Sequence, residues 1–245
     1  RDVLGIAQTG TGKTASFTLP MITLLARGRA RARMPRSLVL CPTRELAAQV
    51  AENFDTYTKH LKLTKALLIG GVSFKEQDQL IDKGVDVLIA TPGRLLDHFE
   101  RGKLLLTGVQ IMVVDEADRM LDMGFIGDVH TLLQGVAEKH QTLLFSATVS
   151  PAVTELANKL LTRHEVIRVA KQNATADTVE HVVYPVEERR KPDLFAELIK
   201  KHNWFQVLVF TSTKRQADEL MMELKYDGIK GAVCHGDKAQ GARRR

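Results

Sequence analysis

The sequence predicts an α/β fold in which a parallel sheet is flanked by helices. Two patterns support this prediction: short apolar runs typical of buried strands, and longer segments whose apolar residues recur at helical spacing. The two kinds of segment alternate along the chain. A parallel neighbour can be reached only through a crossover, so this alternation favours strand–helix–strand units. The expected strands are 3–6, 38–40, 66–69, 87–89, 111–114, 143–145, 207–210 and 232–233, and the expected helices are 14–26, 44–60, 74–81, 95–99, 151–161, 192–202 and 214–226.

A glycine-rich turn follows the first expected strand and predicts a phosphate-binding loop (P-loop). The backbone N–H groups of such a turn converge on phosphate oxygens, and the next helix adds its positive N-terminal dipole. We expect Lys13 to reach the outer phosphates and the Thr14 hydroxyl to bind Mg²⁺. The strict P-loop pattern has Gly where this chain has Ala7, so an ordinary glycine turn is the alternative. The residues expected to bind nucleotide are Gln8, Thr9, Gly10, Thr11, Gly12, Lys13 and Thr14.

Two carboxylates follow the expected buried strand 111–114. Doubly wound sheets place ligand sites at the carboxyl ends of their strands, where Asp115 and Glu116 fall. We expect Asp115 to hold Mg²⁺ and Glu116 to orient and deprotonate the attacking water, because phosphoryl transfer mainly requires positioning and charge neutralisation. A solvated acidic turn is the alternative. Together with Lys13 and Thr14, these carboxylates predict an ATPase.

Composition gives weaker evidence. The formal net charge of +6 favours a polyanionic partner, because Lys and Arg release counterions from phosphates. Cys41 and Cys234 lie near apolar runs, so we expect two buried thiols in a reducing compartment and not a disulfide or a metal site. No apolar run is long enough to span a membrane and the first residues do not form a signal-peptide pattern, so we expect a cytoplasmic location.

The polar, aperiodic stretch 171–177 predicts a linker between a first domain, residues 1–170, and a second segment, residues 178–245. A separate basic run, 27–33, could contact RNA, although such runs more often form solvated loops.

Further short motifs occur along the chain. They are Pro42-Thr43-Arg44-Glu45-Leu46-Ala47, Gly70-Gly71, Thr91-Pro92-Gly93-Arg94, Ser146-Ala147-Thr148, Val207 to Thr211, and His235-Gly236-Asp237 with Gln240 and Arg243. On these motifs the sequence resembles the DEAD-box ATP-dependent RNA helicases of superfamily 2, whose name spells Asp115 to Asp118. Ala7 is the residue that this family normally carries in its P-loop. Gly-Ala-Arg-Arg-Arg at 241–245 and Asn203-Trp204 are similar to the bacterial RhlE-like branch.

The resemblance implies two RecA-like lobes joined at the linker, the first complete or nearly complete and the second truncated. It places the adenine-recognition motif before Arg1 and the finger arginines after Arg245, so this stretch of chain is expected to be poorly active by itself. It also implies a catalytic set of Lys13, Asp115, Glu116, Ser146 and Thr148, in which the Ser-Ala-Thr motif bonds to the acidic motif. Simple capping of the strand end is the alternative for Ser146 and Thr148.

The family's RNA contacts are implied at positions that suit phosphate and 2′-hydroxyl binding without base reading. Those implied are Thr43, Arg44, Gly71, Thr91, Gly93 and Arg94 in the first lobe, and Thr211 and Gln240 to Arg243 in the second. A DNA-directed superfamily-2 helicase and an RNA-clamping scaffold without turnover are the competing classes. A transport or metabolic ATPase would leave these motifs unexplained.

Overall fold

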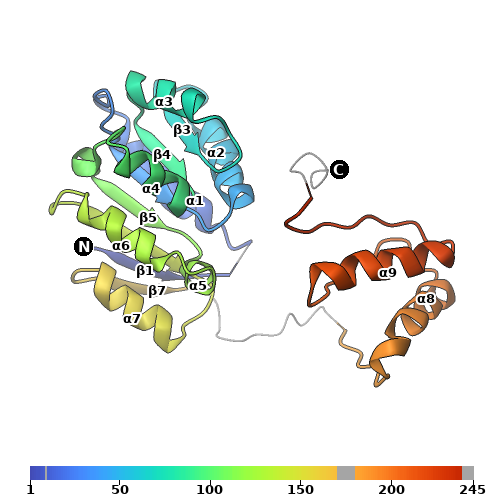
Figure 1. Ribbon diagram of the computed structural model, residues 1–245. Helices are drawn as coiled ribbons and strands as arrows, with labels where there is room; N and C mark the ends of the chain where they lie inside the picture. Colours follow the sequence, from blue (N-terminus) through green and yellow to red (C-terminus); the bar gives the residue numbers. More distant parts are fainter. Residues whose placement is uncertain (9, 170–179, 239–245) are drawn as a thin grey trace. The chain divides into compact units, whose positions relative to one another are not determined.

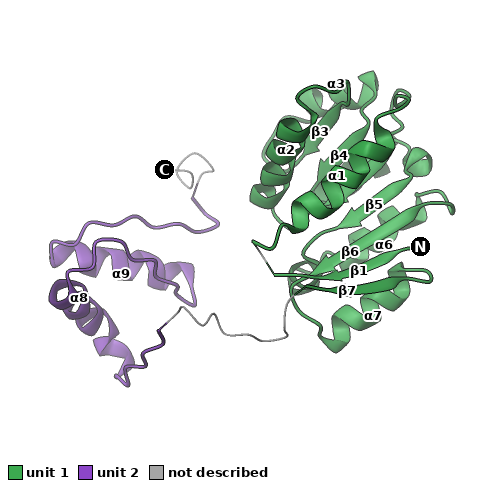
Figure 2. Cartoon of the chain, turned by 180° about the vertical axis from the view of Figure 1, so that it is seen from behind, with its two compact units in different colours: residues 1–176 green, residues 177–245 purple. Residues whose placement is uncertain are grey.

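The structure, a computed structural model, describes residues 1–8, 10–169 and 180–238. Contacts divide the chain into two compact units, Arg1–Ala176 and Asp177–Arg245, which Figure 2 shows in different colours. The expected linker 171–177 lies outside the described residues, as do Thr9, Gln240 and Arg243.

Seven strands of the described residues in unit 1 form one sheet. The strands are β1 Val3–Ile6, β2 Ser37–Leu40, β3 Lys65–Leu68, β4 Val87–Ala90, β5 Ile111–Val114, β6 Gln141–Ser146 and β7 Glu165–Arg168. Their order is β3-β4-β2-β5-β6-β1-β7, and every neighbouring pair is parallel. The predicted α/β class with a parallel sheet flanked by helices is therefore confirmed.

Helices cover both faces of this sheet, as Figure 1 shows. Two of them, α1 and α2, pack on one face, and the other five pack on the opposite face. The central strands β2, β4 and β5 are buried along their whole length because both of their faces are covered. The helices are α1 Lys13–Leu25, α2 Arg44–Thr58, α3 Phe74–Lys83, α4 Pro92–Glu100, α5 Ala117–Asp122, α6 Ile126–Gln134 and α7 Pro151–Leu160, with a 3-10 turn at Leu106–Gly108.

The strand register brings the carboxyl ends of the strands to a common edge. Leu40, the last residue of β2, pairs with Ala90 on one side and Val114 on the other, and both of these residues also end their strands. Ile6 at the end of β1 pairs with Ser146 at the end of β6. Loops that follow different strands therefore meet along this edge, which we call the carboxyl edge.

Unit 2 contains helices α8 Lys191–His202 and α9 Lys214–Tyr226, preceded by a 3-10 turn at Glu188–Arg190. The predicted strands 207–210 and 232–233 are wrong: both segments are irregular. Leu208 and Phe210 are 80% and 87% exposed. Strand formation requires a neighbour that satisfies backbone N–H and C=O groups, and the described part of unit 2 supplies none for these runs.

The cysteine prediction is confirmed for Cys41 and wrong for Cys234. Both are free thiols, but Cys41 is fully buried whereas Cys234 is exposed. Cys234 loses its expected burial because the apolar run before it does not enter a sheet.

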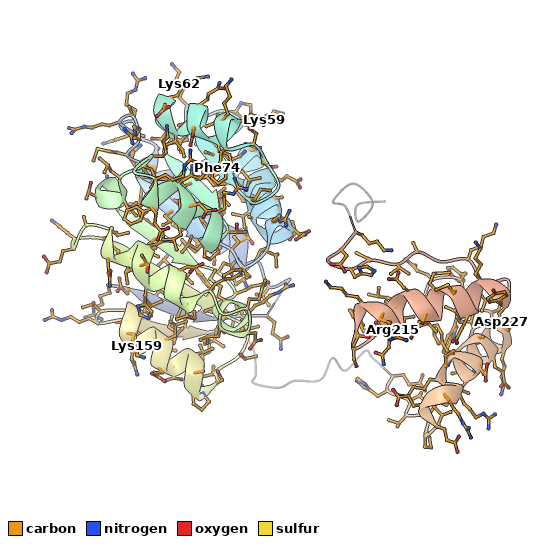
Figure 3. All side chains as sticks on the ribbon, in the orientation of Figure 1. Lys59, Lys62, Phe74, Lys159, Arg215 and Asp227 are labelled. Carbon is orange, nitrogen blue, oxygen red and sulfur yellow. The ribbon has the colours of Figure 1, made fainter. Side chains whose placement is uncertain are left out.

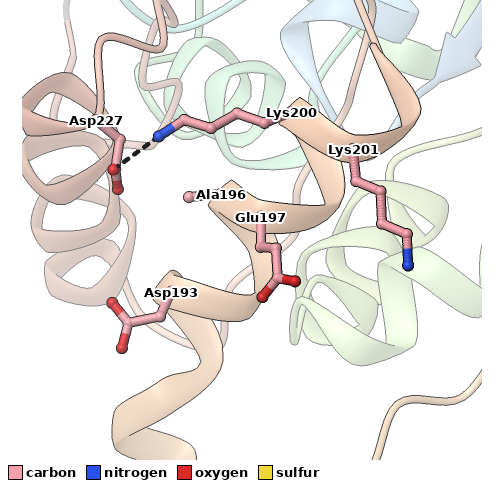
Figure 4. Close-up of a pocket in the computed structure, with 6 residues that line it drawn as sticks. All are labelled: Asp193, Ala196, Glu197, Lys200, Lys201 and Asp227. Carbon is pink, nitrogen blue, oxygen red and sulfur yellow. Dashed lines mark hydrogen bonds and ion pairs between the residues drawn. The ribbon is translucent and has the colours of Figure 1, made fainter.

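A surface hollow lies beside α8 in unit 2 (Figure 4). Its lining combines opposite charges, and Lys200 Nζ lies 2.9 Å from Asp227 Oδ1. The hollow contains none of the residues predicted to be functional. It is lined by Asp193, Ala196, Glu197, Lys200, Lys201 and Asp227.

Candidate functional site

The predicted P-loop turn connects β1 to α1 at the carboxyl edge. Gly10 and Gly12 have φ values of 84° and 82°, in the left-handed region that L-residues rarely adopt. Gly12 caps α1, so Lys13 begins the helix. The Thr11 hydroxyl donates to the Gln8 carbonyl at 2.7 Å and braces the turn. These glycines are therefore needed for backbone conformation, and the turn presents the free N–H groups of a helix N-terminus.

Lys13 and Asp115 form a buried ion pair across this edge. Lys13 Nζ lies 2.9 Å from Asp115 Oδ1, and the two side chains are 8% and 0% exposed. The same carboxylate oxygen accepts a hydrogen bond from the Glu116 N–H at 2.9 Å. Burial raises the pKa of Asp115, and the ammonium of Lys13 opposes that shift. The two sequence motifs thus meet through a direct contact between opposite charges.

The second carboxylate oxygen of Asp115, Oδ2, is buried and has no hydrogen-bond partner among the described residues. An unpaired buried acceptor costs about 1–3 kcal/mol, so its presence needs a reason. A carboxylate and the hydroxyl of Thr14, next to Lys13, are oxygen ligands of the kind that Mg²⁺ prefers. Mg²⁺ commonly takes only one or two protein ligands beside phosphates and water. The described residues contain no cluster of three or more His, Cys, Asp or Glu that could hold a metal, and Asp115 with Thr14 fits this sparser type of site.

Glu116 adopts a left-handed backbone conformation, with φ 52° and ψ 55°, at the start of α5. A non-glycine residue in this region stores strain on the order of 1–3 kcal/mol. The Asp115 carboxylate holds the Glu116 N–H in this turn. The sequence does not reveal this conformation, because Glu carries no preference for positive φ.

The Ser-Ala-Thr motif contacts the acidic motif directly. Asp118 Oδ2 accepts hydrogen bonds from the Thr148 N–H at 3.1 Å and from its hydroxyl at 3.0 Å. The Ser146 hydroxyl donates to the Thr148 carbonyl at 2.9 Å, and the Ser146 carbonyl accepts from Ala7 N–H at 3.0 Å. Ser146 therefore lies between the P-loop strand and the residue that binds Asp118.

Arg44 begins α2 and lies against the glycine pair that follows β3. The preceding Thr43 caps the helix by accepting from the Leu46 N–H at 3.2 Å. A Cβ added to Gly71 would lie 2.7 Å from Arg44 Nη1, and the φ of Gly71 is +80°. Gly71 is thus required by its backbone conformation, and it also gives the guanidinium close access to the turn.

Arg94 connects α4 to the same turn. Thr91 is the N-cap of α4 but makes no side-chain capping bond, so its hydroxyl is not used in that way. Gly93 and Arg94 follow in the first turn of the helix. The Arg94 guanidinium donates to the Val72 carbonyl at 3.3 Å and lies over the Phe74 ring, 3.9 Å from the centroid.

The structure separates the predicted residues of unit 1 into two adjacent groups. Those predicted to contact nucleotide or to be catalytic follow β1, β5 and β6, whereas those implied for RNA follow β2, β3 and β4. Because the sheet order is β3-β4-β2-β5-β6-β1-β7, each group occupies the ends of three neighbouring strands at the carboxyl edge. We call these the nucleotide half and the RNA half.

Thr211 lies in unit 2, where its hydroxyl donates to the Thr213 carbonyl at 3.0 Å. The basic run 27–33 lies before β2, at the amino edge of the sheet. There the Arg33 guanidinium donates hydrogen bonds to the carbonyls of Gly102 and Lys103. The basic run therefore lies at the opposite edge of the sheet from the RNA half.

Sequence reasoning missed a buried polar group beneath the RNA half. His98 of α4 and Gln77 of α3 are 0% and 2% exposed, and His98 Nε2 lies 2.8 Å from Gln77 Oε1. A usable signal was present, since Gln77 lies four residues before Ile81 on the apolar stripe of its helix.

Residues 1–156 match the family model described as DEAD/DEAH box helicase, and the chain belongs to this family. The predicted DEAD-box membership is thereby confirmed.

Two curated relatives match almost the whole length of this chain. An ATP-dependent RNA helicase RhlB from Pseudomonas aeruginosa is 41% identical over 99% of this chain and 63% of its own length. A DEAD-box ATP-dependent RNA helicase CshA from Bacillus cereus is 38% identical over 99% of this chain and 46% of its own. The chain thus spans about half to two thirds of these relatives. The finer assignment to the RhlE-like branch stays a prediction.

Solved structures agree with the fold. A DEAD box protein from Methanococcus jannaschii is 35% identical with a TM-score of 0.63, and covers 99% of this chain and 64% of its own. Yeast Dbp5 bound to Gle1 and IP6 is 30% identical with a TM-score of 0.70, and covers 100% of this chain and 60% of its own. Among the described residues, no helix is both long and apolar enough to cross a membrane.

Proposed function

We propose that the chain is the nucleotide-binding and RNA-binding core of an ATP-dependent RNA helicase, which couples ATP hydrolysis to local unwinding and remodelling of RNA. The observation that carries this proposal is the buried Lys13–Asp115 pair, whose second carboxylate oxygen has no partner among the described residues. A charge pair of this kind is prepared to exchange partners when a polyphosphate enters.

In the nucleotide half, the backbone from Gln8 to Gly12, Thr9 included, surrounds the phosphates, and Lys13 transfers its ammonium from Asp115 to the outer phosphates. Thr14 and Asp115 hold Mg²⁺, which when bound neutralises charge on the phosphate oxygens. Glu116 orients the attacking water and takes its proton. In the structure the Glu116 carboxylate oxygen Oε2 lies 3.5 Å from Arg119 Nη1.

Ser146 and Thr148 connect these events to the rest of the lobe. Thr148 binds Asp118, and Ser146 binds both Thr148 and the strand that leads into the P-loop. A shift of the acidic motif on hydrolysis therefore changes hydrogen bonds at the end of β6. Such a two-state contact gives nucleotide a way to favour one lobe arrangement over another.

In the RNA half, Thr43, Arg44, Gly71, Thr91, Gly93 and Arg94 bind phosphates and 2′-hydroxyls, and Thr211, Gln240 and Arg243 contribute from the second lobe. Hydroxyls, guanidinium groups and exposed turns suit backbone contact, so little sequence specificity is expected. The proposed division is an ATP-binding lobe at 1–170, a linker at 171–177 and the N-terminal part of a second lobe at 178–245. A cytoplasmic location remains a prediction.

The test is ATP turnover by the intact protein with RNA or with single-stranded DNA of the same sequence. The proposal predicts stimulation by RNA and weak stimulation by DNA. Equal stimulation would instead support a DNA-directed superfamily-2 helicase. RNA binding without turnover, under conditions where nucleotide binds, would support the clamping scaffold.

A further inference from the structure

The buried polar group beneath the RNA half begins with His98 and Gln77. Gln77 Nε2 donates to the Ile69 carbonyl at 3.0 Å, which directs the amide oxygen towards His98. His98 Nε2 is consequently the donor in the 2.8 Å contact with Gln77 Oε1. Ile69 immediately precedes the Gly70-Gly71 turn, so this chain of bonds connects α4 to that turn.

Charged groups surround the other side of the imidazole. His98 Nδ1 lies 3.0 Å from Asp78 Oδ1 but out of line for a hydrogen bond, and Asp78 Oδ2 lies 3.5 Å from Arg101 and 3.8 Å from Lys103. Burial lowers the pKa of His98, while the Asp78 carboxylate opposes this shift. The imidazole thus makes one hydrogen bond to α3, through Nε2, and faces a carboxylate of the same helix with Nδ1.

The His98 ring also supports an aromatic platform. Its centroid lies 5.0 Å from that of Phe74, which is labelled in Figure 3. The guanidinium groups of Arg94 and Arg101 lie over the Phe74 ring, 3.9 Å and 4.6 Å from its centroid. A guanidinium over an aromatic face is attracted by the ring quadrupole, so Phe74 restricts where Arg94 can point.

We propose that His98 is a positioning residue for RNA binding, which fixes the Gly70-Gly71 turn through Gln77 and the guanidinium of Arg94 through Phe74. This inference rests on the proposed RNA-binding role of the same edge. A buried apolar side chain could fill this volume without the cost of desolvating polar groups. The polar and aromatic contacts add orientation, and both of their endpoints lie in the RNA half.

The positioning role predicts a specific defect. Replacing His98 by Leu removes the donor that faces Gln77 Oε1 and the ring that supports Phe74. The concentration of RNA giving half-maximal ATPase stimulation should rise about three- to tenfold, which corresponds to the loss of one well-placed contact. The kcat at saturating RNA and the affinity for nucleotide should remain those of the wild type, because the nucleotide half is untouched.

The experiment uses the intact protein and two pairs of variants. His98→Gln keeps an N–H donor near the Nε2 position and should recover much of the RNA affinity that His98→Leu loses. Phe74→Tyr should bind RNA like the wild type, whereas Phe74→Leu should resemble His98→Leu. His164→Leu, just before β7 at the amino edge, is the matched control and should leave RNA binding unchanged. If His98→Leu does not fold, the Phe74 pair carries the test, since Phe74 is only partly buried.

A double-mutant cycle separates positioning from general loss of stability. In an Arg94→Ala background, Phe74→Leu should cause little further loss, because the group that it positions is absent. Additive losses, a parallel fall in nucleotide affinity, or unchanged RNA affinity in Phe74→Leu would overturn the positioning role. If Arg94→Ala itself binds RNA normally, the proposed RNA-binding role of the RNA half is overturned together with the positioning role. If only Arg94→Ala is defective, the RNA half stands and the support by His98 and Phe74 does not.

Discussion

The two halves of the carboxyl edge use charge differently. In the nucleotide half, Lys13 and Asp115 are buried and paired with each other. In the RNA half, Arg44 is exposed, and Arg94 is partly exposed and supported by an aromatic ring and a backbone carbonyl. Buried charges interact strongly, so the stability of each depends on its partner. The interactions of exposed charges are weakened by water and salt. Changes in the nucleotide half should therefore cause larger defects than single changes in the RNA half.

The largest expected effect is on the chemical step. Glu116→Gln keeps the shape of the side chain but removes the base, so turnover should fall about 10²- to 10⁴-fold while ATP affinity stays near that of the wild type. Steady-state turnover and calorimetry on the intact protein measure the two quantities. Glu155→Gln, on the exposed face of α7, is the control. Wild-type turnover in Glu116→Gln would exclude the assigned role.

The second-largest effect is expected from breaking the buried Lys13–Asp115 pair. Lys13→Ala removes the ammonium that faces the phosphates, and ATP affinity should weaken about 10- to 100-fold, as expected for one lost charge-assisted contact. It also leaves the buried Asp115 without its partner, which lowers stability by up to about 3–5 kcal/mol. Calorimetry and urea unfolding test both effects. Lys159→Ala, which breaks an exposed pair with Glu155, should change either quantity by little. Unchanged ATP affinity in folded Lys13→Ala would contradict the P-loop assignment.

The RNA half should respond more weakly and uniformly. Arg44→Ala and Arg94→Ala should each weaken binding of all RNA sequences alike and reduce the salt dependence by about one phosphate contact. Titrations at several salt concentrations with two unrelated RNA sequences measure this slope. Arg215→Ala, on an exposed part of α9 in unit 2, provides a comparison for loss of one positive charge. A defect confined to one RNA sequence would indicate base reading and so break the distinction between the halves.

The strands of unit 1 could be predicted because most are buried apolar runs. The edge strand β7, Glu165–Arg168, was missed because its four residues are exposed and carry no continuous apolar run. The run at 207–210 is more apolar than β7, yet it forms no strand, because a sheet also requires a neighbour to pair with. Apolar composition therefore identifies candidates, and tertiary pairing selects among them.

Prediction of the functional site from the sequence has the same limit. The positions of Lys13 and Asp115 could be predicted to converge, because residues after parallel strands share an edge. The contact between Gln77 and His98 could not, because it joins residues 21 positions apart through the packing of α3 against α4. The left-handed turn at Glu116 was equally hidden, since it opposes the local preference of that residue. Motifs thus locate the chemistry, whereas its support depends on packing.

The smallest expected effect concerns pH and the support of the RNA half. The pKa of His98 is lowered from its ordinary value of 6.5 by burial, against the opposing Asp78 and together with Arg94 and Arg101. Below pH 6.5 the unfolded chain therefore binds more protons at this residue than the folded chain does. The free energy of unfolding should then fall as pH drops through 6.5, by at most about 1.4 kcal/mol per pH unit for one proton.

Urea unfolding of the wild type, His98→Gln and the control His164→Gln at several pH values isolates this contribution. The difference between wild type and His98→Gln matters, because carboxylates elsewhere add their own pH dependence to both proteins. His98→Gln should lose stability less steeply on acidification than the wild type, whereas His164→Gln should keep the wild-type slope. A wild type that gains stability relative to His98→Gln at low pH would mean that Asp78 outweighs burial and holds a charged imidazole. In that case the RNA half, like the nucleotide half, would contain a buried ion pair, and the contrast between the two would be smaller than the exposure of its arginines suggests.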